Sequence, residues 1–271
     1  MKFLAALPSR MVVLIAILFS AFPIYWIAAM ALKSPKEAFA IPPVFAFTPV
    51  WENFSRAWEM GGFDASMINS LVITIFVNLV TLAAAIPAAY ALSRHEFSGQ
   101  KIFLVLLLLF YLLPEFLFII PLYNVFQTLG LFDTRIGLII AYQVFSLPFA
   151  IWLLRGFFAE IPRDIGEAAQ LDGCSNFGVL WRMYIPLSVP GIAAVVILNS
   201  IRMWNELTYA LALTFSTSQT VTLSVASFRG YGQMDWGAMS AGAVISAAPM
   251  VLMALFAQRY IVRGLTLGAV K

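Results

Sequence analysis

The sequence contains little from which a metal site or a disulfide could be built. Its 271 residues include one cysteine, Cys174, and one histidine, His95. A single cysteine cannot close an internal disulfide, and a single histidine cannot supply a histidine-rich set of metal ligands. Redox chemistry and metal chemistry are therefore not expected of this chain.

Charged residues are also scarce. They make up 11% of the chain, whereas 62% of the residues are hydrophobic and the mean hydropathy is +0.92. A soluble domain of this length has too little interior to bury so many apolar side chains, so the composition indicates an integral membrane protein that lies in the lipid bilayer. The net charge of +3 is small and the basic residues form no cluster, which argues against nucleic acid as a partner.

Six apolar runs are long enough to cross a bilayer, which takes about 20 helical residues. They cover residues 12–32, 67–92, 102–123, 136–158, 189–213 and 238–260. The sequence thus predicts an all-α, polytopic membrane protein whose single transmembrane domain comprises residues 1–271. The first run is longer than the apolar region of a signal peptide and is expected to be retained. Prolines inside the runs predict kinked helices.

The distribution of lysine and arginine predicts the orientation of these spans, because cytoplasmic loops carry an excess of both residues. With the N-terminus inside, ten basic residues fall in cytoplasmic segments: Lys2, Arg10, Arg94, Lys101, Arg155, Arg163, Arg182, Arg259, Arg263 and Lys271. Five fall in outer segments: Lys33, Lys36, Arg56, Arg135 and Arg229. Both termini are therefore expected in the cytoplasm.

The longest cytoplasmic segment, residues 159–188, has the signals of two short helices joined by a turn. Asp164 suits the positive end of a first helix, and Asp172–Gly173 breaks that helix. Ser175 can cap a second helix, which is expected to stop by Tyr184 because a proline follows two residues later.

Four residues at helical spacing give the second helix one apolar, largely aromatic face. They are Phe177, Leu180, Trp181 and Tyr184. An apolar helical face in the cytoplasm suits a groove of another protein. The pattern leaves a second possibility open, in which this face packs on its own helical bundle or on lipid headgroups.

The same segment resembles the EAA loop of permease subunits of ATP-binding-cassette importers. It carries Glu167-Ala168-Ala169, then Gly173, and then Ile185-Pro186 at the spacing of that family. Met183 where the family prefers isoleucine, and Ile185 where it prefers leucine, are mild departures. The likeness extends along the chain to the smaller permease of maltose-type carbohydrate importers, through the blocks IPLYNVFQTLGLFDTRIGLII, FFAEIPRDIGEAAQLDG, MWNELTYAL and QRYIVRGLTLGAVK.

This resemblance implies an importer of several subunits in a bacterial cytoplasmic (inner) membrane. The expected partners are a second permease subunit, two ATPase subunits and an extracytoplasmic sugar-binding protein. The chain lacks the phosphate-binding pattern GxxxxGK[ST]. ATP and Mg are therefore expected in the partner ATPase subunits, and neither a cofactor nor an enzymatic activity is expected in this chain.

Within the EAA loop, the resemblance implies roles in coupling to the ATPase. Glu167 would pair with a basic residue of the ATPase, Gly173 would allow the turn, and the apolar face would fill a groove. The expected coupling residues are Glu167, Ala168, Ala169, Asp172, Gly173, Phe177, Leu180 and Trp181. The tail, residues 263–271, would also lie against the ATPase dimer.

Two outer segments are long enough to meet a binding protein, residues 33–66 and 216–236. The second alternates polar and apolar residues as a strand does. In maltose-type importers this segment reaches into the cleft of the binding protein, so the expected contacts are Arg229, Tyr231 and Gln233. A lid that only covers the bundle is the alternative.

One arginine lies deep inside a predicted span, far from both of its ends. Arg202 is about midway along the fifth run, where a cation costs roughly 2.5–3.5 kcal/mol on insertion scales and therefore needs a partner. Glu206 follows four residues later, and Glu115 lies in the third run beside a proline that could bring it near. One interpretation is an ion pair that fixes helix packing.

The other interpretation places Arg202 on the substrate path, where it would bind an anionic group of a sugar. Trp204 and Asn205 would then suit the apolar face and the hydroxyls of that sugar. A competing function is a self-sufficient secondary transporter or channel, in which Glu115, Arg202 and Glu206 form an ion relay. The EAA loop favours the importer subunit, because a secondary transporter has no use for such a loop.

Overall fold

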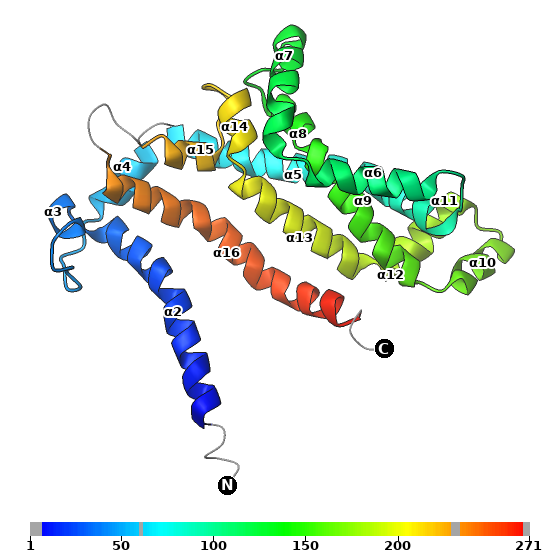
Figure 1. The fold of residues 1–271 in the computed structure, drawn as a ribbon, viewed down its shortest axis with the longest axis horizontal. Helices are drawn as coiled ribbons and strands as arrows, with labels where there is room; N and C mark the ends of the chain where they lie inside the picture. The colour runs from blue at the N-terminus through cyan, green and yellow to red at the C-terminus, as the bar shows by residue number, and fades with distance from the viewer. Residues whose placement is uncertain (1–6, 60–61, 229–233, 268–271) are drawn as a thin grey trace. The chain divides into compact units, whose positions relative to one another are not determined.

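The computed structural model describes residues 7–59, 62–228 and 234–267 (Figure 1). In these ranges all regular elements are helices. They are α2 (Leu7–Leu32), α3 (Pro35–Ala38), α4 (Glu52–Glu59), α5 (Phe63–Arg94), α6 (Gln100–Leu112), η2 (Glu115–Phe118), α7 (Ile119–Leu129), α8 (Arg135–Ala141), α9 (Gln143–Glu160), α10 (Arg163–Leu171), α11 (Asn176–Val179), η3 (Leu180–Tyr184), α12 (Ile185–Leu187), α13 (Val189–Asn205), α14 (Thr208–Leu213), α15 (Val221–Ala226) and α16 (Trp236–Leu267).

Three helical stretches are long and apolar enough to cross a membrane without a break: Arg10–Leu32 in α2, the whole of α5, and Trp236–Leu255 in α16. Three further stretches reach that length only as bent pairs. The bend is 96° between α6 and the stretch Glu115–Leu129, 45° between α8 and α9, and 74° between the stretch Asn176–Leu187 and α13. The described residues thus provide three to six spans by length and composition, and the predicted all-α membrane architecture is confirmed.

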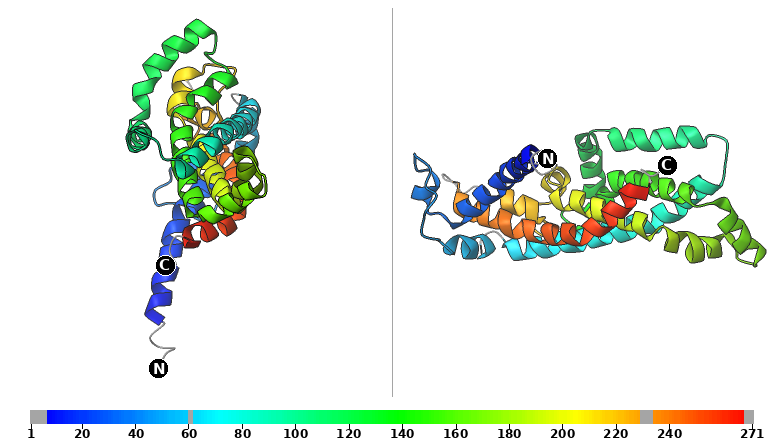
Figure 2. Two further views of the ribbon diagram at one scale, coloured as in Figure 1. Left: turned by 90° about the vertical axis from the view of Figure 1, so that its right-hand side faces the viewer. Right: turned by 90° about the horizontal axis from the view of Figure 1, so that it is seen from below.

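The third predicted span is not one continuous helix. α6 ends at Leu112, Leu113 is extended with φ −64° and ψ 139°, and η2 begins at Glu115 directly after Pro114. Proline has no N–H to continue a helix, and it disfavours the α conformation for the residue before it. Figure 2 shows the resulting sharp turn between α6 and α7.

The fifth predicted span is also interrupted. α13 ends at Asn205, Glu206 is extended with φ −69° and ψ 129°, and α14 begins at Thr208. The carboxylate of Glu206 accepts the backbone N–H groups of Tyr209 at 2.8 Å and Ala210 at 3.2 Å. These N–H groups have no partner within their own helix, so the acidic side chain satisfies the start of α14.

Residues 159–188, here called the EAA segment, form the two predicted helices. Gly173, at φ +87°, makes the turn between them, and the hydroxyl of Ser175 accepts the backbone N–H of Gly178 at 3.2 Å. The expectation that the second helix stops by Tyr184 is wrong. The chain passes through a π-helical turn, η3, into α12, where Pro186 lies in the first turn and its missing N–H is tolerated.

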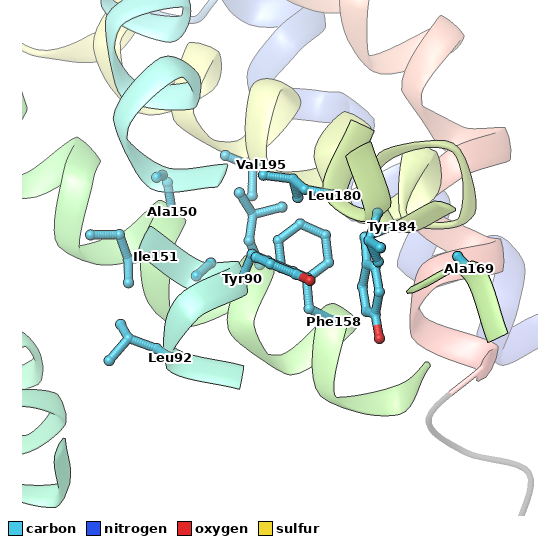
Figure 3. Packing of buried hydrophobic residues seen from close by; sticks show 13 residues of the cluster. Tyr90, Leu92, Ala150, Ile151, Phe158, Ala169, Leu180, Tyr184 and Val195 are labelled. Carbon is cyan, nitrogen blue, oxygen red and sulfur yellow. The ribbon is translucent and has the colours of Figure 1, made fainter. Parts of the chain in front are cut away.

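An aromatic cluster joins this segment to two of the long helices (Figure 3). Tyr90 of α5, Phe158 of α9 and Tyr184 of η3 are all buried. The ring centroids are 5.0 Å apart for Tyr90 and Tyr184, 6.1 Å for Phe158 and Tyr184, and 6.4 Å for Tyr90 and Phe158, all edge to face. This arrangement is favourable for aromatic quadrupoles, so the EAA segment is anchored by specific ring contacts.

The chain divides into two compact units, residues 1–65 with 224–248 and residues 66–223 with 249–271. In the first unit, the side-chain amide of Asn53 donates to the carbonyls of Ala31 at 2.9 Å and Lys33 at 3.0 Å. The buried ammonium of Lys33 lies 4.4 Å from the ring centroid of Trp26, a cation–π contact. The second unit contains the EAA segment and the intramembrane charges.

Candidate functional site

The apolar face of the EAA segment is divided between two environments. Phe177 and Trp181 are 68% and 55% exposed and contact each other with ring centroids 5.9 Å apart. Leu180 and Tyr184 are buried at 4% and 1% exposure. The two interpretations of this face therefore each hold for half of it: two residues are free for a partner, and two pack on the bundle of their own chain.

The remaining residues of the motif also divide by exposure. Glu167, Ala168, Asp172 and Gly173 are exposed, whereas Ala169 is buried at 4%. The outer surface of the EAA segment thus carries a carboxylate and a pair of aromatic rings, and its inner surface carries small and apolar side chains.

Gly166, which precedes the motif, was not singled out from the sequence although its size matters. A Cβ at this position would lie 3.1 Å from the hydroxyl oxygen of Tyr184 and 3.7 Å from a methyl carbon of Val179. Gly166 is itself buried. α10 can therefore approach η3 closely only because this residue has no side chain.

Arg94 connects the end of α5 to the EAA segment and to the end of α9. The sequence indicated only that it is a charge on the expected cytoplasmic side. Its guanidinium donates hydrogen bonds to the backbone carbonyls of Phe158 and, at 2.5 Å, of Ile161, both at the end of α9. The same group lies 4.6 Å from the ring centroid of Tyr184. Arg155 of α9 in turn donates to the carbonyl of Leu92 near the end of α5 at 3.3 Å. Each helix thus supplies a cation to the carbonyl end of the other, where the helix dipole favours positive charge.

Arg202 has a partner within the membrane-spanning part. Its guanidinium forms an ion pair of 2.5 Å with Glu115, and its centre lies 4.4 Å from the ring centroid of Phe145 and 5.1 Å from that of Tyr111. The two charged side chains are 32% and 30% exposed. The expectation of an internal ion pair is met with Glu115, which the break after Pro114 brings to α13.

The carboxylate of Glu206 binds other groups and not Arg202 in the described structure. It is 6% exposed, and besides the two backbone N–H groups of α14 it accepts the hydroxyl of Tyr142 at 2.8 Å. Of the neighbouring candidates, Trp204 is buried at 3%, and Asn205 is exposed and donates to the carbonyl of Ile201 at 2.7 Å. The α-helical spacing that predicted Arg202 and Glu206 as neighbours does not hold, because α13 ends at Asn205.

A pocket of about 240 Å³ lies beside Arg202. Its lining residues are Tyr111, Phe145, Phe149, Leu198, Asn199 and Arg202. Asn199 is 1% exposed and donates to the side-chain oxygen of Asn78 at 3.2 Å, while its own Oδ1 has no hydrogen-bond donor among the described residues. A buried amide oxygen without a donor next to a pocket is an acceptor ready for a ligand or a water molecule. Asn199 was not among the residues expected at the site, although an amide inside an apolar run is a visible signal in the sequence.

Asp133, between α7 and α8, organises the start of the segment 216–236 that is expected on the outer side. Its carboxylate accepts the backbone N–H groups of the four consecutive residues 215–218, at distances from 3.0 to 3.2 Å, and the hydroxyl of Thr217 at 2.5 Å. Burial alone would raise the pKa of this carboxyl, but the hydrogen bonds from Phe215, Thr217 and Ser216 outweigh burial and hold the pKa of Asp133 well below its ordinary value.

The strand predicted for residues 216–236 is wrong in its described part. After the Asp133-bound turn, residues Val221–Ala226 form the helix α15. Asn69 of α5 donates to the carbonyls of Thr217 at 3.1 Å and Gln219 at 2.9 Å, and these tertiary bonds replace a strand ladder. The predicted binding-protein contacts Arg229, Tyr231 and Gln233 lie outside the described residues, as does the end of the tail, residues 268–271.

A protein-family model described as binding-protein-dependent transport system inner membrane component matches residues 81–267, which include the whole EAA segment. The chain belongs to this family. Family membership makes it an inner-membrane transport component and agrees with the predicted permease role, not with a self-sufficient transporter.

Individual relatives span nearly the whole chain. The probable ABC transporter permease protein YurM of Bacillus subtilis (strain 168) is 38% identical over 93% of this chain and 84% of the relative. The trehalose transport system permease protein SugB of Mycobacterium tuberculosis (strain CDC 1551 / Oshkosh) is 35% identical over 92% of both chains. A solved bacterial ABC transporter involved in the import of the acidic polysaccharide alginate matches with a TM-score of 0.76 over 96% of both chains; at 23% identity this likeness concerns the fold.

Proposed function

We propose that this chain is a permease subunit of an importer that carries a carbohydrate into the cytoplasm. Two partner ATPase subunits bind ATP and Mg and supply the energy, a second permease subunit completes the pathway, and an extracytoplasmic sugar-binding protein delivers the substrate. Both termini face the cytoplasm of a bacterial cell. The relatives named for trehalose transport and the family itself support this proposal.

The observation that carries the proposal is the two-sided EAA segment. Phe177 and Trp181 expose two adjacent rings, and Glu167 of the same segment is exposed too, while Leu180 and Tyr184 are buried against the bundle. A segment exposed on one side and anchored on the other can transmit the movement of a partner to the spans. Tryptophan is also enriched among the residues that dominate binding at protein interfaces.

The test uses the importer assembled in membranes with its ATPase subunits. Glu167→Lys places a cation against the expected basic residue of the ATPase, and sugar uptake should fall about tenfold or more, with weaker co-purification of the ATPase. Glu160→Lys is the matched control, because Glu160 is also exposed but lies at the end of α9, outside the motif. Normal uptake by Glu167→Lys, with the chain inserted in the membrane, would remove the coupling role.

A second proposal concerns the pocket beside Arg202, which we place on the substrate path. The free oxygen of Asn199 would accept a sugar hydroxyl, and the rings of Tyr111 and Phe145 would contact the apolar face of the sugar. Asn199→Ala should raise the KM for uptake about fivefold, the effect of one lost hydrogen bond. Ser200→Ala is the control: Ser200 also binds Asn78, at 2.9 Å, but does not line the pocket, so its KM should not change. Equal effects of both variants would contradict the proposal.

An anionic sugar is the finer form of this proposal, and it carries an additional requirement. Its acidic group would have to take Arg202 from Glu115, since the guanidinium is already neutralised by that carboxylate. Uptake of a neutral sugar and of its uronic-acid analogue by Arg202→Lys decides between the two forms. A loss restricted to the acidic sugar favours anion binding, and an equal loss for both sugars favours the structural ion pair.

A further inference from the structure

A pocket of about 750 Å³ lies where α5 turns into α6. Its lining includes none of the intramembrane charges and neither Phe177 nor Trp181, but it does include Arg163 of the EAA segment. Its lining includes the cations Lys101, Arg155 and Arg163, the acid Glu96, and His95. Three cations and one carboxylate give a net charge of +2 with the histidine neutral. All three cations belong to the set that the sequence places on the cytoplasmic side, so the pocket lies at the expected cytoplasmic ends of the helices.

The wall of this pocket is fixed by hydrogen bonds. The carbonyl of Leu92 accepts the side-chain amide of Gln100 at 2.6 Å and the Nε of Arg155 at 3.3 Å, and all three residues line the pocket. The turn between the two helices is closed by Gly99 at φ +89°. The pocket is therefore formed before any ligand binds.

The one carboxylate among the described lining residues, Glu96, interacts only weakly with the cations. Glu96 and Arg163 approach to 3.8 Å, and their side chains are 88% and 62% exposed. An exposed ion pair of this kind contributes little in water. Arg163 can exchange Glu96 for a stronger anion at low cost.

A strip of hydrocarbon begins at the rim of the pocket. Ile102 lines the pocket and is 68% exposed, and along the same face of α6 follow Val105, Leu109 and Leu112, which are 57%, 52% and 66% exposed. Their spacing of three and four residues aligns them along the helix. No residue of α6 is buried. Cations and exposed apolar side chains thus meet at one end of one helix.

We propose that this pocket binds the phosphate headgroup of an anionic phospholipid, with an acyl chain along the Ile102–Leu112 face of α6. The headgroup satisfies Lys101 and Arg163, for which phosphate oxygens are good acceptors, and the acyl chain covers the apolar face. Basic pockets between helices on the cytoplasmic side are suitable sites for such headgroups. The proposal depends on the membrane location and not on the transport cycle, so it stands or falls independently of the proposed function.

The experiment measures lipid retention by the full-length chain in detergent, by native mass spectrometry with added phosphatidylglycerol or phosphatidylcholine. Phosphatidylglycerol should bind and phosphatidylcholine should bind at least tenfold more weakly. Lys101→Gln and Arg163→Gln should each weaken phosphatidylglycerol binding about fivefold, in line with the contribution of one basic residue near an anionic lipid. Arg182→Gln is the matched control, because Arg182 is exposed on the expected cytoplasmic side but does not line the pocket.

Three results would overturn the proposal. Equal binding of phosphatidylcholine would remove the requirement for an anion. Competition by inorganic phosphate or glycerol phosphate at the affinity of the intact lipid would indicate a soluble anion and no role for the α6 face. A photo-crosslinker at position 101 that reaches another protein subunit in the assembled importer, and no lipid, would make the pocket a protein interface. A loss in Val105→Asp comparable to that in Lys101→Gln would support the acyl-chain contact directly.

Discussion

Arg202 of α13 and Glu115 at the start of η2, which are 87 residues apart in the sequence, form an ion pair of 2.5 Å, and the guanidinium also contacts the rings of Phe145 and Tyr111. A single cation in a span is unfavourable, and this carboxylate offsets its charge. The pair also joins the broken third span to the fifth. We infer that it contributes to the packing of these helices whatever its role toward substrate.

The ion pair predicts a thermodynamic cycle. Arg202→Met leaves Glu115 without its partner and should destabilise the chain by about 2 kcal/mol, between the values for exposed and fully buried pairs, since both side chains are about a third exposed. Arg202→Met with Glu115→Met should recover most of that loss. Thermal unfolding in detergent measures both. If Glu206→Gln, and not Glu115→Met, restored the stability of Arg202→Met, the partner of Arg202 would be Glu206.

Gly166 gives a test in which two effects oppose each other. Gly166→Ala gains helix propensity, worth about 1 kcal/mol, but brings a Cβ to 3.1 Å from the hydroxyl of Tyr184. In the wild-type background the net effect should be zero or destabilising. In a Tyr184→Phe background the hydroxyl is absent, and Gly166→Ala should stabilise by up to about 1 kcal/mol. Stabilisation of equal size in both backgrounds would exclude the close approach of α10 to η3.

Arg94 should affect coupling more than binding. Arg94→Met removes the hydrogen bonds to Phe158 and Ile161 and the contact with Tyr184, so the EAA segment loses these links to α5 and keeps its ring contact with Tyr90. In the assembled importer we expect more ATP hydrolysed per sugar transported, with Arg94→Lys partly restoring the ratio. Arg182→Met serves as the control from the exposed side of the same segment. An unchanged ratio in Arg94→Met would limit Arg94 to stability.

The stability of the turn around Asp133 should fall as the pH is lowered. The hydrogen bonds to its ionised carboxylate lower the pKa of Asp133 in the folded chain, so the stabilisation is complete above the unfolded value of about 3.9 and is lost as the pH falls toward the lower folded pKa. Amide hydrogen exchange at residues 215–218 should therefore accelerate below pH 4 beyond its intrinsic change.

Asp133→Asn is the matched variant for this turn. Asparagine tolerates the left-handed conformation of this residue, φ 54°, but offers one acceptor oxygen in place of two. Exchange at residues 215–218 should be faster at neutral pH and should lose its additional acid dependence. An acid dependence that persists in Asp133→Asn would assign it to another group.

The orientation can be tested with thiol reagents. Cys174 in the EAA segment should react with a membrane-impermeant reagent only from the cytoplasmic side. In a Cys174→Ser background, a cysteine introduced by Phe215→Cys should react only from the outer side, because Phe215 is 75% exposed. The reverse pattern would invert the orientation and the assignment of both surfaces.

Much of the architecture followed from composition and local signals. The apolar runs predicted a helical membrane protein, and Asp172–Gly173 with Ser175 predicted the turn of the EAA segment, because these features depend on residues close in sequence. The breaks of helices inside the predicted spans could not be predicted in the same way. Pro148 lies within α9 without ending it, whereas Pro114 ends α6, and the chain carries no local signal that separates the two cases.

The side-chain partners at the candidate site could not be predicted, because they come from tertiary contacts and the periodicity of a sequence indicates only which residues share a helix face. The spacing from Arg202 to Glu206 predicted neighbours on one helix face, but the helix ends at Asn205 and the carboxylate turns to α14 and Tyr142. In the same way Phe177 and Leu180 share a helical face in projection, yet only Phe177 is exposed, because Leu180 packs in the cluster around Tyr184.

Arg94 and Arg155 are expected to act both during membrane insertion and in the folded protein. During synthesis, positive charges in the last turns of helices such as α5 and α9 bias insertion so that these ends stay on the expected cytoplasmic side. In the finished protein the same guanidinium groups bind the carbonyls of Phe158, Ile161 and Leu92. A charge-neutral replacement at either position therefore perturbs biogenesis and the native contacts together. A lysine replacement separates the two effects, because it keeps the positive charge that directs insertion but lacks the planar guanidinium that binds the carbonyls.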